Sequence, residues 1–460
     1  MKLPILTNPN PILRKKSVEI NKITPELLEL AQNMLETMVL DGIGLAAPQV
    51  GQNVRLIVIG NEKPSKNETG FSTKIMFNPI IVSKSKEKEL DSEGCLSLPG
   101  LTGVVKRNVS ILVKYTNEKN EIVKYEARNL EARAIQHEID HLDGKLFIDR
   151  LEKYRVVYFG TPQFSIAPLL SLIAHPQFDV VGIVTETDKK GGRGHNMLTS
   201  PIKDYAIKNG TSLLQPATFN TSHANSILAH EAKIVIKNLR SLKPDFIVVA
   251  AYGKILPQEV LNIAKIAPIN IHPSMLPLYR GADPIRGAIL NGDNETGVCI
   301  MLMVPKMDAG AVLTLAKSKI KIDDTYETLS NHLSNLSSVL LTYTLENIIA
   351  EKAEIFEQNE SKATFTHKYT TENRVIDWAN SAKQIHDKIR AFAPNIGVIT
   401  KIDNQELLIT HSSYLDNKLT VNEVQIPGKS KVSLADFKNG HRKIYEELMK
   451  LVNEVNSRYT

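Results

Sequence analysis

The strongest constraint on the fold is a change of pattern at Tyr154, which divides the 460-residue chain into two parts of different architecture. Before it, a helical stretch at Pro25–Leu40 precedes short β-rich runs, and a second helical stretch covers Glu131–His141. After it, an apolar strand at Arg155–Phe159 begins an alternation of strands with helical stretches. Such alternation is typical of a doubly wound, parallel, Rossmann-like sheet. The sequence therefore predicts an α+β part followed by an α/β part.

The length of the chain is about three times that of a usual single domain, so we expect several domains. The expected strands are Val54–Ile59, Ile75–Val82, Val109–Tyr115 and Ile122–Ala127 in the first part, and Val180–Val184, Phe246–Ala250 and Ala267–Ile271 in the second. A helix is expected at Leu336–Ala350, before a polar, weakly patterned segment. We predict domains over residues 1–152, 154–352 and 373–460, with a linker over 353–372.

Composition excludes several classes of protein. Hydrophobic residues make up 42% and charged residues 23%, so the chain is neither disordered nor fibrous. The two cysteines, Cys95 and Cys299, are far apart, which rules out a disulfide framework and favours a reducing compartment. No apolar run reaches the ~18 residues of a membrane span, and the first residues lack a secretory core. We therefore expect a cytoplasmic protein that has no membrane partner, with Cys299 in the core.

The net charge of +6 does not by itself indicate a nucleic-acid partner. Residues 1–153 hold 22 basic and 20 acidic side chains, and residues 154–460 hold 34 and 30, which leaves +2 and +4. Five basic residues gather between Gly428 and Lys443, against one acidic residue. On charge alone, a nucleic-acid contact and an ordinary solvated surface explain this cluster equally well.

A metal site is predicted in the first part by His137-Glu138-Ile139-Asp140-His141. Two imidazoles at i and i+4 share one face of a helix and can reach one cation, with Glu138 toward its open side. A surface helix is the alternative, although chance matches to this spacing are rare in a chain with 12 histidines. Cys95 is the best candidate for a third ligand, and its alternative role is that of a buried apolar thiol. These three ligands leave one position for water, whose pKa the cation lowers.

A glycine-containing segment, Gly42–Gln49, allows backbone to come close to a ligand. Together with Glu93-Gly94-Cys95-Leu96-Ser97 and the histidine motif, it resembles the three motifs of peptide deformylases, and Asn10–Arg14 resembles that family too. The resemblance implies removal of the formyl group from N-formyl-methionyl peptides.

The same resemblance implies roles for individual residues. Cys95, His137 and His141 would hold a divalent metal, for which Fe²⁺ is the family's usual choice and Zn²⁺ is compatible. Glu138 would be the general base and acid. The Gln49 side chain and the Leu96 N–H would stabilise the oxyanion, and Gly44 would be a further residue of this catalytic site. The methionine pocket would be lined by Ile43, Leu130 and Ala134.

A second site is predicted where the expected strand Ala267–Ile271 ends. Asn270 and His272 alternate onto one side of this strand, at the carboxyl edge where α/β proteins place their sites, and Asp308 follows later. By themselves, these three residues fit a purely structural role as well as a functional one.

The surrounding motifs resemble methionyl-tRNA formyltransferases. They are Phe159–Phe164, Asp188–Pro201, Leu276–Ile285 and Gly292–Val298, followed by Ile376–Trp378 and Ile389–Phe392 in a C-terminal domain. The resemblance implies transfer of formyl from 10-formyltetrahydrofolate to the amine of initiator Met-tRNA. Asn270 and protonated His272 would donate to the developing oxyanion, and Asp308 would orient His272.

Binding residues are also implied by this resemblance. The folate would be held by Tyr252, Gly253, Ile255, Ser274, Leu276 and Pro277, and tRNA would be contacted by Arg193, Lys429, Lys431, Arg442 and Lys443. No lysine directly follows Arg193-Gly194, which predicts a weaker contact through that loop. Between Leu407 and Pro427 the expected OB-like barrel is shortened by one or two strands.

The leading hypothesis is a bifunctional enzyme of translation initiation, whose partners are initiator Met-tRNA and N-formyl-methionyl nascent peptides at the ribosome. Two alternatives stay open. In one, one half is catalytically silent and tethers the other to tRNA or the ribosome. In the other, the formyltransferase half acts on a small amine.

Overall fold

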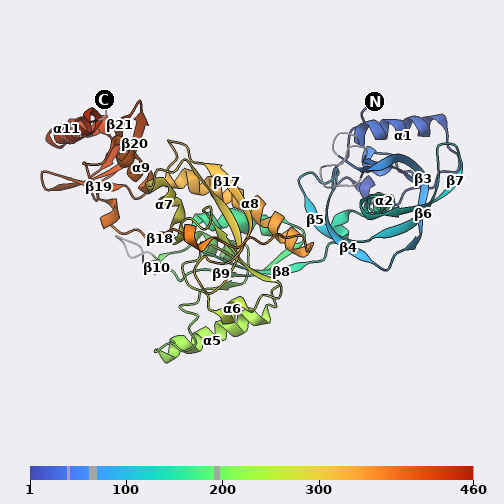
Figure 1. Cartoon of the computed structure of the whole chain (residues 1–460), viewed down its shortest axis with the longest axis horizontal. Helices are drawn as coiled ribbons and strands as arrows, with labels where there is room; N and C mark the ends of the chain where they lie inside the picture. Colours follow the sequence, from blue (N-terminus) through green and yellow to red (C-terminus); the bar gives the residue numbers. More distant parts are fainter. Residues whose placement is uncertain (39–41, 62–69, 191–196, 459–460) are drawn as a thin grey trace. The chain divides into compact units, whose positions relative to one another are not determined.

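The chain forms two compact units in the computed structural model (Figure 1), which describes residues 1–38, 42–61, 70–190 and 197–458. The first unit contains Met1–Lys153 together with two short later segments, His175–Gln177 and Leu345–Ala353. The second unit contains Tyr154–Ala174, Phe178–Thr344 and Glu354–Thr460. The change of pattern at Tyr154 therefore coincides with the main boundary between the units.

The first unit has the predicted α+β composition. Its five-stranded antiparallel sheet has the order β1-β2-β3-β6-β7, and β4 pairs with β5 in a separate hairpin. Its elements are α1 (Pro25–Met38), β1 (Gly44–Ala46), β2 (Leu56–Asn61), β3 (Phe71–Lys84), β4 (Lys88–Gly94), β5 (Thr102–Asn108), β6 (Ser110–Thr116), β7 (Ile122–Arg128) and α2 (Asn129–Leu142), with short 3-10 turns at Pro11–Arg14, Ala47–Val50 and Phe147–Arg150.

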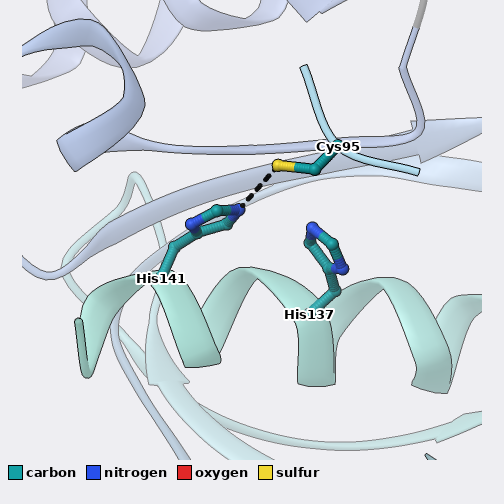
Figure 2. A group of neighbouring side chains, drawn as sticks. All are labelled: Cys95, His137 and His141. Carbon is teal, nitrogen blue, oxygen red and sulfur yellow. Dashed lines mark hydrogen bonds between the residues drawn. The ribbon is translucent and has the colours of Figure 1, made fainter. Parts of the chain in front are cut away.

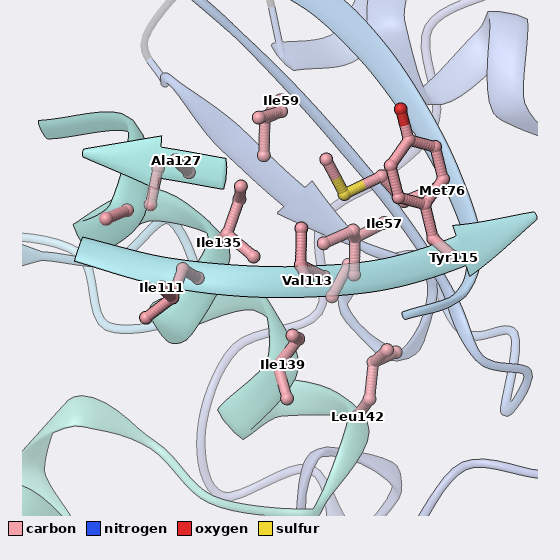
Figure 3. Close-up of a cluster of buried hydrophobic side chains, with 13 residues drawn as sticks. Ile57, Ile59, Met76, Ile111, Val113, Tyr115, Ala127, Ile135, Ile139 and Leu142 are labelled. Carbon is pink, nitrogen blue, oxygen red and sulfur yellow. The ribbon is translucent and has the colours of Figure 1, made fainter. Parts of the chain in front are cut away.

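Helix α2 is held against the sheet by its apolar face (Figure 3). Ile135, Ile139 and Leu142 recur at helical spacing and join a buried cluster with sheet residues such as Ile57 and Val113. Full burial of each such side chain stabilises the fold by about 1.5–3 kcal/mol. The residues between them, His137, Glu138 and His141, are buried on another side of the same helix. Packing of α2 therefore fixes where its polar face points.

The two later segments of the first unit make polar contacts with the β4–β5 hairpin. The Glu346 carboxylate accepts hydrogen bonds from the hydroxyls of Ser92 (2.9 Å) and Thr102 (2.7 Å), and it lies 3.0 Å from Nε2 of His175. The Gln177 amide exchanges two 2.9 Å hydrogen bonds with the backbone of Val104. The hairpin, whose first strand ends directly before Cys95, is thus held along both strands.

The second unit is built on a seven-stranded sheet in the order β12-β9-β8-β13-β14-β16-β17. Strands β12, β9, β8, β13 and β14 are parallel as predicted, whereas β16 and β17 are antiparallel additions at one edge. The sheet strands are β8 (Tyr154–Gly160), β9 (Phe178–Val184), β12 (Leu213–Leu214), β13 (Phe246–Ala250), β14 (Ala267–His272), β16 (Glu295–Leu302) and β17 (Val312–Lys319). Figure 1 shows these strands with their connecting helices in the middle of the chain's colour range. The helices are α3 (Ile166–Ala174), α4 (Pro201–Lys208), α5 (Ser226–Ser241), α6 (Gln258–Leu261), α7 (Pro284–Leu290) and α8 (Tyr326–Ile349).

Helix α8 begins ten residues before the predicted helix at Leu336–Ala350. Its first half is rich in serine and threonine, which usually compete with helical hydrogen bonding. Here the Ser337 and Ser338 hydroxyls donate back to the carbonyl of Ser334, at 2.7 and 3.0 Å. The Ser334 hydroxyl, in the part that was not predicted, donates at 2.6 Å to the Phe164 carbonyl outside the helix, a partner that composition alone did not indicate.

The C-terminal region contains a small antiparallel sheet, β19-β20-β21-β22, with helices α9, α10 and α11. Its elements are α9 (Ala382–Phe392), β19 (Val398–Ile402), β20 (Gln405–Leu415), β21 (Lys418–Gln425), β22 (Val432–Ser433), α10 (Leu434–Gly440) and α11 (Arg442–Ser457). Two short pairings complete the list, β10 (Lys189–Lys190) with β11 (Met197–Leu198) and β15 (Arg280–Gly281) with β18 (Phe365–Thr366). Strand β18 comes from the segment expected to be a linker. None of the helices described is both long and apolar enough to cross a membrane.

Candidate active sites

Three ligand-type side chains converge in the first unit (Figure 2). His137 and His141 lie one turn apart on α2, and both face Cys95, which directly follows β4. One sulfur or nitrogen atom from each residue lies within 4.8 Å of the others, and the Cys95 Sγ to His141 Nε2 distance is 3.3 Å. The structure therefore brings together all three residues predicted as metal ligands.

The donor set fits a divalent transition metal. A tetrahedral ion with bonds of about 2.0 Å to nitrogen and 2.3 Å to sulfur holds its ligand atoms about 3.3–3.8 Å apart. The Nδ1 of His137 is 2.9 Å from the Glu93 carboxylate, so it is committed to that contact and Nε2 is left for a metal. Burial holds the pKa of His141 well below its ordinary value, which favours the neutral imidazole that a metal requires.

Glu93 is at the centre of a buried ionic network behind the ligands. Its carboxylate accepts two hydrogen bonds from Arg107, both 2.9 Å, and one of 2.8 Å from Arg133. Arg107 also contacts Asp140 at 2.5 Å. Burial disfavours the Glu93 charge, yet hydrogen bonds from Arg107 and His137 hold the pKa of its carboxyl well below the usual range. The network therefore fixes an ionised carboxylate that orients His137.

Glu138 faces a cavity of about 1070 Å³ that is also lined by the ligand residues Cys95 and His137. Burial raises the pKa of its carboxyl to about 7, and among the described residues its Oε2 has no hydrogen-bond partner. A Cβ atom on Gly44 would lie only 2.4 Å from Glu138 Oε1, so a larger residue at this position would displace the Glu138 side chain. The same cavity is lined by Gln49 and Leu96, and by the predicted pocket residues Ile43, Leu130 and Ala134.

Gln49 is 2% exposed and points its amide toward the ligand cluster. Its Nε2 donates to Ser97 Oγ at 3.3 Å and approaches Cys95 Sγ at 3.6 Å, while Oε1 accepts from the Ala46 N–H at 2.8 Å. The short bond fixes the amide, and the two long contacts leave its donor group free to be drawn toward a ligand in the cavity.

The second site lies at the carboxyl ends of parallel strands β13 and β14, as predicted. Asn270 and His272 share one side of β14, and Asp308 comes from the loop between β16 and β17. The Asp308 carboxylate accepts from Asn270 Nδ2 at 3.3 Å and from the Gly281 N–H at 2.7 Å, and it is 3.7 Å from His272 Nδ1. The structure therefore groups the three predicted residues around this carboxylate.

His272 is 4% exposed, and its two ring nitrogens have different surroundings. Its Nε2 is 2.9 Å from the backbone carbonyl of Tyr279. A carbonyl only accepts hydrogen bonds, so Nε2 carries a proton, and Nδ1, which faces Asp308, is the nitrogen that can exchange one.

Three family models match the chain in order. A polypeptide deformylase model matches residues 2–156, a formyl transferase model matches residues 153–345, and the C-terminal domain model of formyl transferases matches residues 368–420. The methionyl-tRNA formyltransferase of Dictyoglomus turgidum is 36% identical over 315 residues, which cover 63% of this chain and 96% of that protein. The corresponding enzyme of Thermotoga maritima is 33% identical and is covered over 95% of its length. The chain belongs to the methionyl-tRNA formyltransferase family. A polypeptide deformylase domain precedes that part.

Solved structures also resemble the deformylase domain. A probable peptide deformylase from Synechococcus phage S-SSM7 is 44% identical, with 33% of this chain and all of that chain covered and a TM-score of 0.30. A class I type b peptide deformylase from Acinetobacter baumannii is 33% identical, with 33% and 99% covered and a TM-score of 0.32.

The residues expected to bind folate in the formyltransferase domain have diverse surroundings. Ile255 is 76% exposed and lines a cavity of about 500 Å³ with Phe219 and Lys254. Tyr252 packs in a T-shaped contact on Phe159, and within the described residues its buried hydroxyl has no hydrogen-bond partner. Gly253 allows the Glu186 carboxylate to come close, because a Cβ atom there would lie 1.9 Å from Glu186 Oε1.

Ser274, Leu276 and Pro277 form a turn after β14. The Ser274 hydroxyl is fully buried and donates to the Leu278 carbonyl at 2.7 Å, and Leu276 belongs to a core cluster with Cys299. The side chains of Ser274 and Leu276 are therefore used internally. Cys299 is buried as expected, and burial raises the pKa of its thiol to about 12.

The described residues predicted to contact tRNA lie at the C-terminal surface, whereas Arg193 lies outside the described residues. Lys429 is exposed. Lys431 donates to the Pro394 carbonyl at 2.6 Å, and Lys443 pairs with Asp403 at 2.8 Å. Arg442 pairs with Glu446 at 2.9 Å on one helix face. Exposed pairs of this kind contribute about 0–1 kcal/mol, so they can be exchanged for phosphate contacts.

Sequence reasoning missed the residues that hold the ligands in place. Glu93 is part of the motif that contains Cys95, so its position next to a ligand was the available signal. Asp140 likewise lies inside the histidine motif, whereas Arg107 and Arg133 carried no signal beyond their charge. In the formyltransferase domain, Arg280 lies in a quoted motif yet is fully buried, and no feature of the sequence singled out Gln358.

Proposed function

We propose that this chain carries out two opposite formyl reactions of protein synthesis. The deformylase domain removes the formyl group from N-formyl-methionyl peptides, and the formyltransferase domain transfers formyl from 10-formyltetrahydrofolate to the amine of initiator Met-tRNA. The first activity is supported by the convergence of Cys95, His137 and His141 beside Glu138 in one cavity. The second is supported by the grouping of Asn270 and His272 around one carboxylate.

For deformylation, Cys95, His137 and His141 hold a divalent cation, with Fe²⁺ as the expected metal and Zn²⁺ as the alternative. When bound, the cation supplies Lewis-acid activation of water and of the formyl carbonyl. Glu138, whose Oε2 has no partner among the described residues, takes the proton of the attacking water and returns it to the leaving amine. The Gln49 amide and the Leu96 N–H donate to the developing oxyanion.

For formyl transfer, the methionyl amine attacks the formyl carbon, and the carbon–nitrogen bond to the folate then breaks. The second proton of the Asn270 amide, which is not used by Asp308, donates to the developing oxyanion. Because Nε2 of His272 is engaged by Tyr279, we assign Nδ1 as the nitrogen that donates to this oxygen when protonated. Asp308 stabilises the charged ring and helps move the proton of the amine to the departing folate nitrogen.

Binding assignments follow the same two substrates. The folate is held near Tyr252, Gly253 and Ile255 and by the turn at Ser274, Leu276 and Pro277. Lys429, Lys431, Arg442 and Lys443 contact tRNA phosphates, and Arg193 contacts the acceptor end. Both substrates belong to translation, so we place the enzyme in the cytoplasm, with nascent peptides reached at the ribosome.

The two activities can share a chain because they act on different molecules. The amine that is formylated is attached to tRNA, whereas the formyl group that is removed is at the end of a peptide. A deformylase cavity that does not admit an aminoacyl-tRNA prevents a futile cycle.

The test uses the purified full chain in two separate assays, formyl release from a formyl-Met peptide and formylation of Met-tRNA. We expect Glu138→Ala to abolish the first activity alone and His272→Ala to abolish the second alone. Loss of both activities in either variant would contradict independent sites. Absence of one activity in the wild-type chain would indicate a silent half, and formylation of a small amine in place of Met-tRNA would replace the acceptor.

A further inference from the structure

The segment that follows α8 is not a free spacer but lies against the loops of the formyl-transfer site. The Thr364 N–H donates to the Pro277 carbonyl at 3.2 Å, and the Thr364 carbonyl accepts from the Arg280 N–H at 2.8 Å. Strand β18 then pairs with β15, which contains Arg280 and Gly281. Chain 78 to 86 residues distant in sequence is therefore in direct hydrogen-bonded contact with the loop after His272.

Gln358, at the start of this contact, uses its full hydrogen-bonding capacity. Its Oε1 accepts from Nε and Nη2 of Arg280, at 3.0 and 2.8 Å. Its Nε2 donates to the backbone carbonyls of Asp308 at 2.8 Å and Gly310 at 2.7 Å. Arginine only donates and carbonyls only accept, so the orientation of the amide is unambiguous. The fully buried Arg280 guanidinium thereby orients Gln358, and Gln358 holds the loop that carries Asp308.

Asp308 needs such support because its backbone is in a left-handed conformation, with φ of 49°. This conformation costs most residues with a side chain roughly 1–2 kcal/mol, and aspartate, which adopts it more readily, is kept in it here by its surroundings. Gln358 binds the carbonyl of Asp308, while the Gly281 N–H and Asn270 bind its carboxylate. The residue is therefore held at both ends, and its carboxylate is kept between Asn270 and His272.

We propose that Gln358 is a positioning residue for formyl transfer, which acts by holding Asp308 in its left-handed conformation through the buried guanidinium of Arg280. The proposal rests on the proposed formyltransferase activity. A displacement of about 1 Å in a catalytic group can lower the rate by about 100-fold, so loss of this support is expected to reduce kcat without weakening substrate binding.

Two variants separate positioning from simple structural support. Gln358→Glu keeps two oxygens for Arg280 but removes both donors to the Asp308 and Gly310 carbonyls, whereas Gln358→Ala removes all four bonds. If Gln358 positions Asp308, kcat for Met-tRNA formylation falls by about 10-fold or more in both variants, with KM for folate and for Met-tRNA within about twofold. If Gln358 only provides hydrogen-bond acceptors for Arg280, the Gln358→Glu variant retains wild-type kcat, and the proposal is overturned.

The matched control is Glu360→Gln. Glu360 is exposed and accepts from the same guanidinium at 2.8 and 3.1 Å and from Lys306 Nζ at 2.7 Å, but none of its hydrogen bonds within the described part of the chain goes to Asp308. We expect kcat within about twofold of wild type, and a loss equal to that of Gln358→Glu would contradict the proposed route. Unchanged KM values for folate and for Met-tRNA report that the formyltransferase domain of each variant is folded.

A second measurement is independent of activity. Residue-resolved hydrogen exchange at the Gly281 amide, which donates to the Asp308 carboxylate, should accelerate in both Gln358 variants and not in Glu360→Gln. Unchanged exchange in both Gln358 variants would overturn the proposal. A wild-type chain that fails to formylate Met-tRNA would instead refute the proposed activity, and the exchange result would still show whether Gln358 holds Asp308.

Discussion

Replacing Glu93 by glutamine should impair the deformylase site, although none of the proposed metal ligands is replaced. The carboxylate accepts four hydrogen bonds, from Arg107 (two), Arg133 and His137. An amide can accept on one side only, so two bonds to cationic or ring donors are lost, and its own N–H groups face those donors. Hydrogen bonds to charged groups contribute about 1.5–3 kcal/mol each, and breaking one partner of a buried ion pair costs about 3–5 kcal/mol. We therefore expect the free energy of unfolding of this domain to fall by about 3–5 kcal/mol.

The same change should weaken metal binding, because His137 loses the acceptor that orients its ring. Loss of such a partner typically lowers metal affinity or activity by about 10- to 100-fold. Chelator competition and formyl-peptide hydrolysis by the full chain measure these effects, and urea unfolding measures the stability. The control is Glu126→Gln, whose pair with Arg128 is exposed and should contribute at most about 1 kcal/mol. A Glu93→Gln protein with the metal affinity and stability of the control would refute the reasoning.

Three further changes test other parts of the structure. Gly44→Ala places a Cβ atom 2.4 Å from Glu138 Oε1 and should lower formyl-peptide hydrolysis at least about 10-fold, with Met-tRNA formylation unchanged in the same preparation. Gly281 has a φ of 102°, and a Cβ atom there would lie 2.4 Å from the Thr366 carbonyl oxygen. Gly281→Ala should therefore lower Met-tRNA formylation and leave formyl-peptide hydrolysis unchanged, as paired assays of the two activities would show. Burial opposes the charge of Glu346, but hydrogen bonds from its histidine and two hydroxyl partners outweigh it and lower its pKa. Its contribution, about 2 kcal/mol, is therefore present above about pH 4.5 and lost as the pH falls. Glu346→Gln should thus destabilise the deformylase domain at pH 7 but much less near pH 3, as urea unfolding at both values would show.

The sequence predicted those parts of the structure that depend on local periodicity. His137 and His141 lie on one face because the helical repeat is fixed by backbone geometry, and the apolar strand Phe246–Ala250 is buried on both faces. The start of α8 was missed because serine and threonine side chains usually oppose helices, whereas here the Ser334 hydroxyl donates to the Phe164 carbonyl outside the helix. The antiparallel direction of β16 and β17 was not predicted, since periodicity does not reveal strand direction.

The two sites also show why supporting residues are not predicted by local sequence patterns. In each, the reacting or ligating residue lies in a short motif, whereas the residue that holds it is bound to a buried arginine from another element, 14 residues away for Glu93 and 78 residues away for Gln358. Arg107 and Arg280 are at most 6% exposed, although charged residues are usually expected at the surface. A buried guanidinium must have its donors satisfied, and the acceptors that satisfy it, Glu93 and Gln358, are in turn bound to His137 and to the Asp308 loop. The partner of a buried arginine is therefore the position at which a conservative substitution should separate loss of catalytic geometry from loss of the fold.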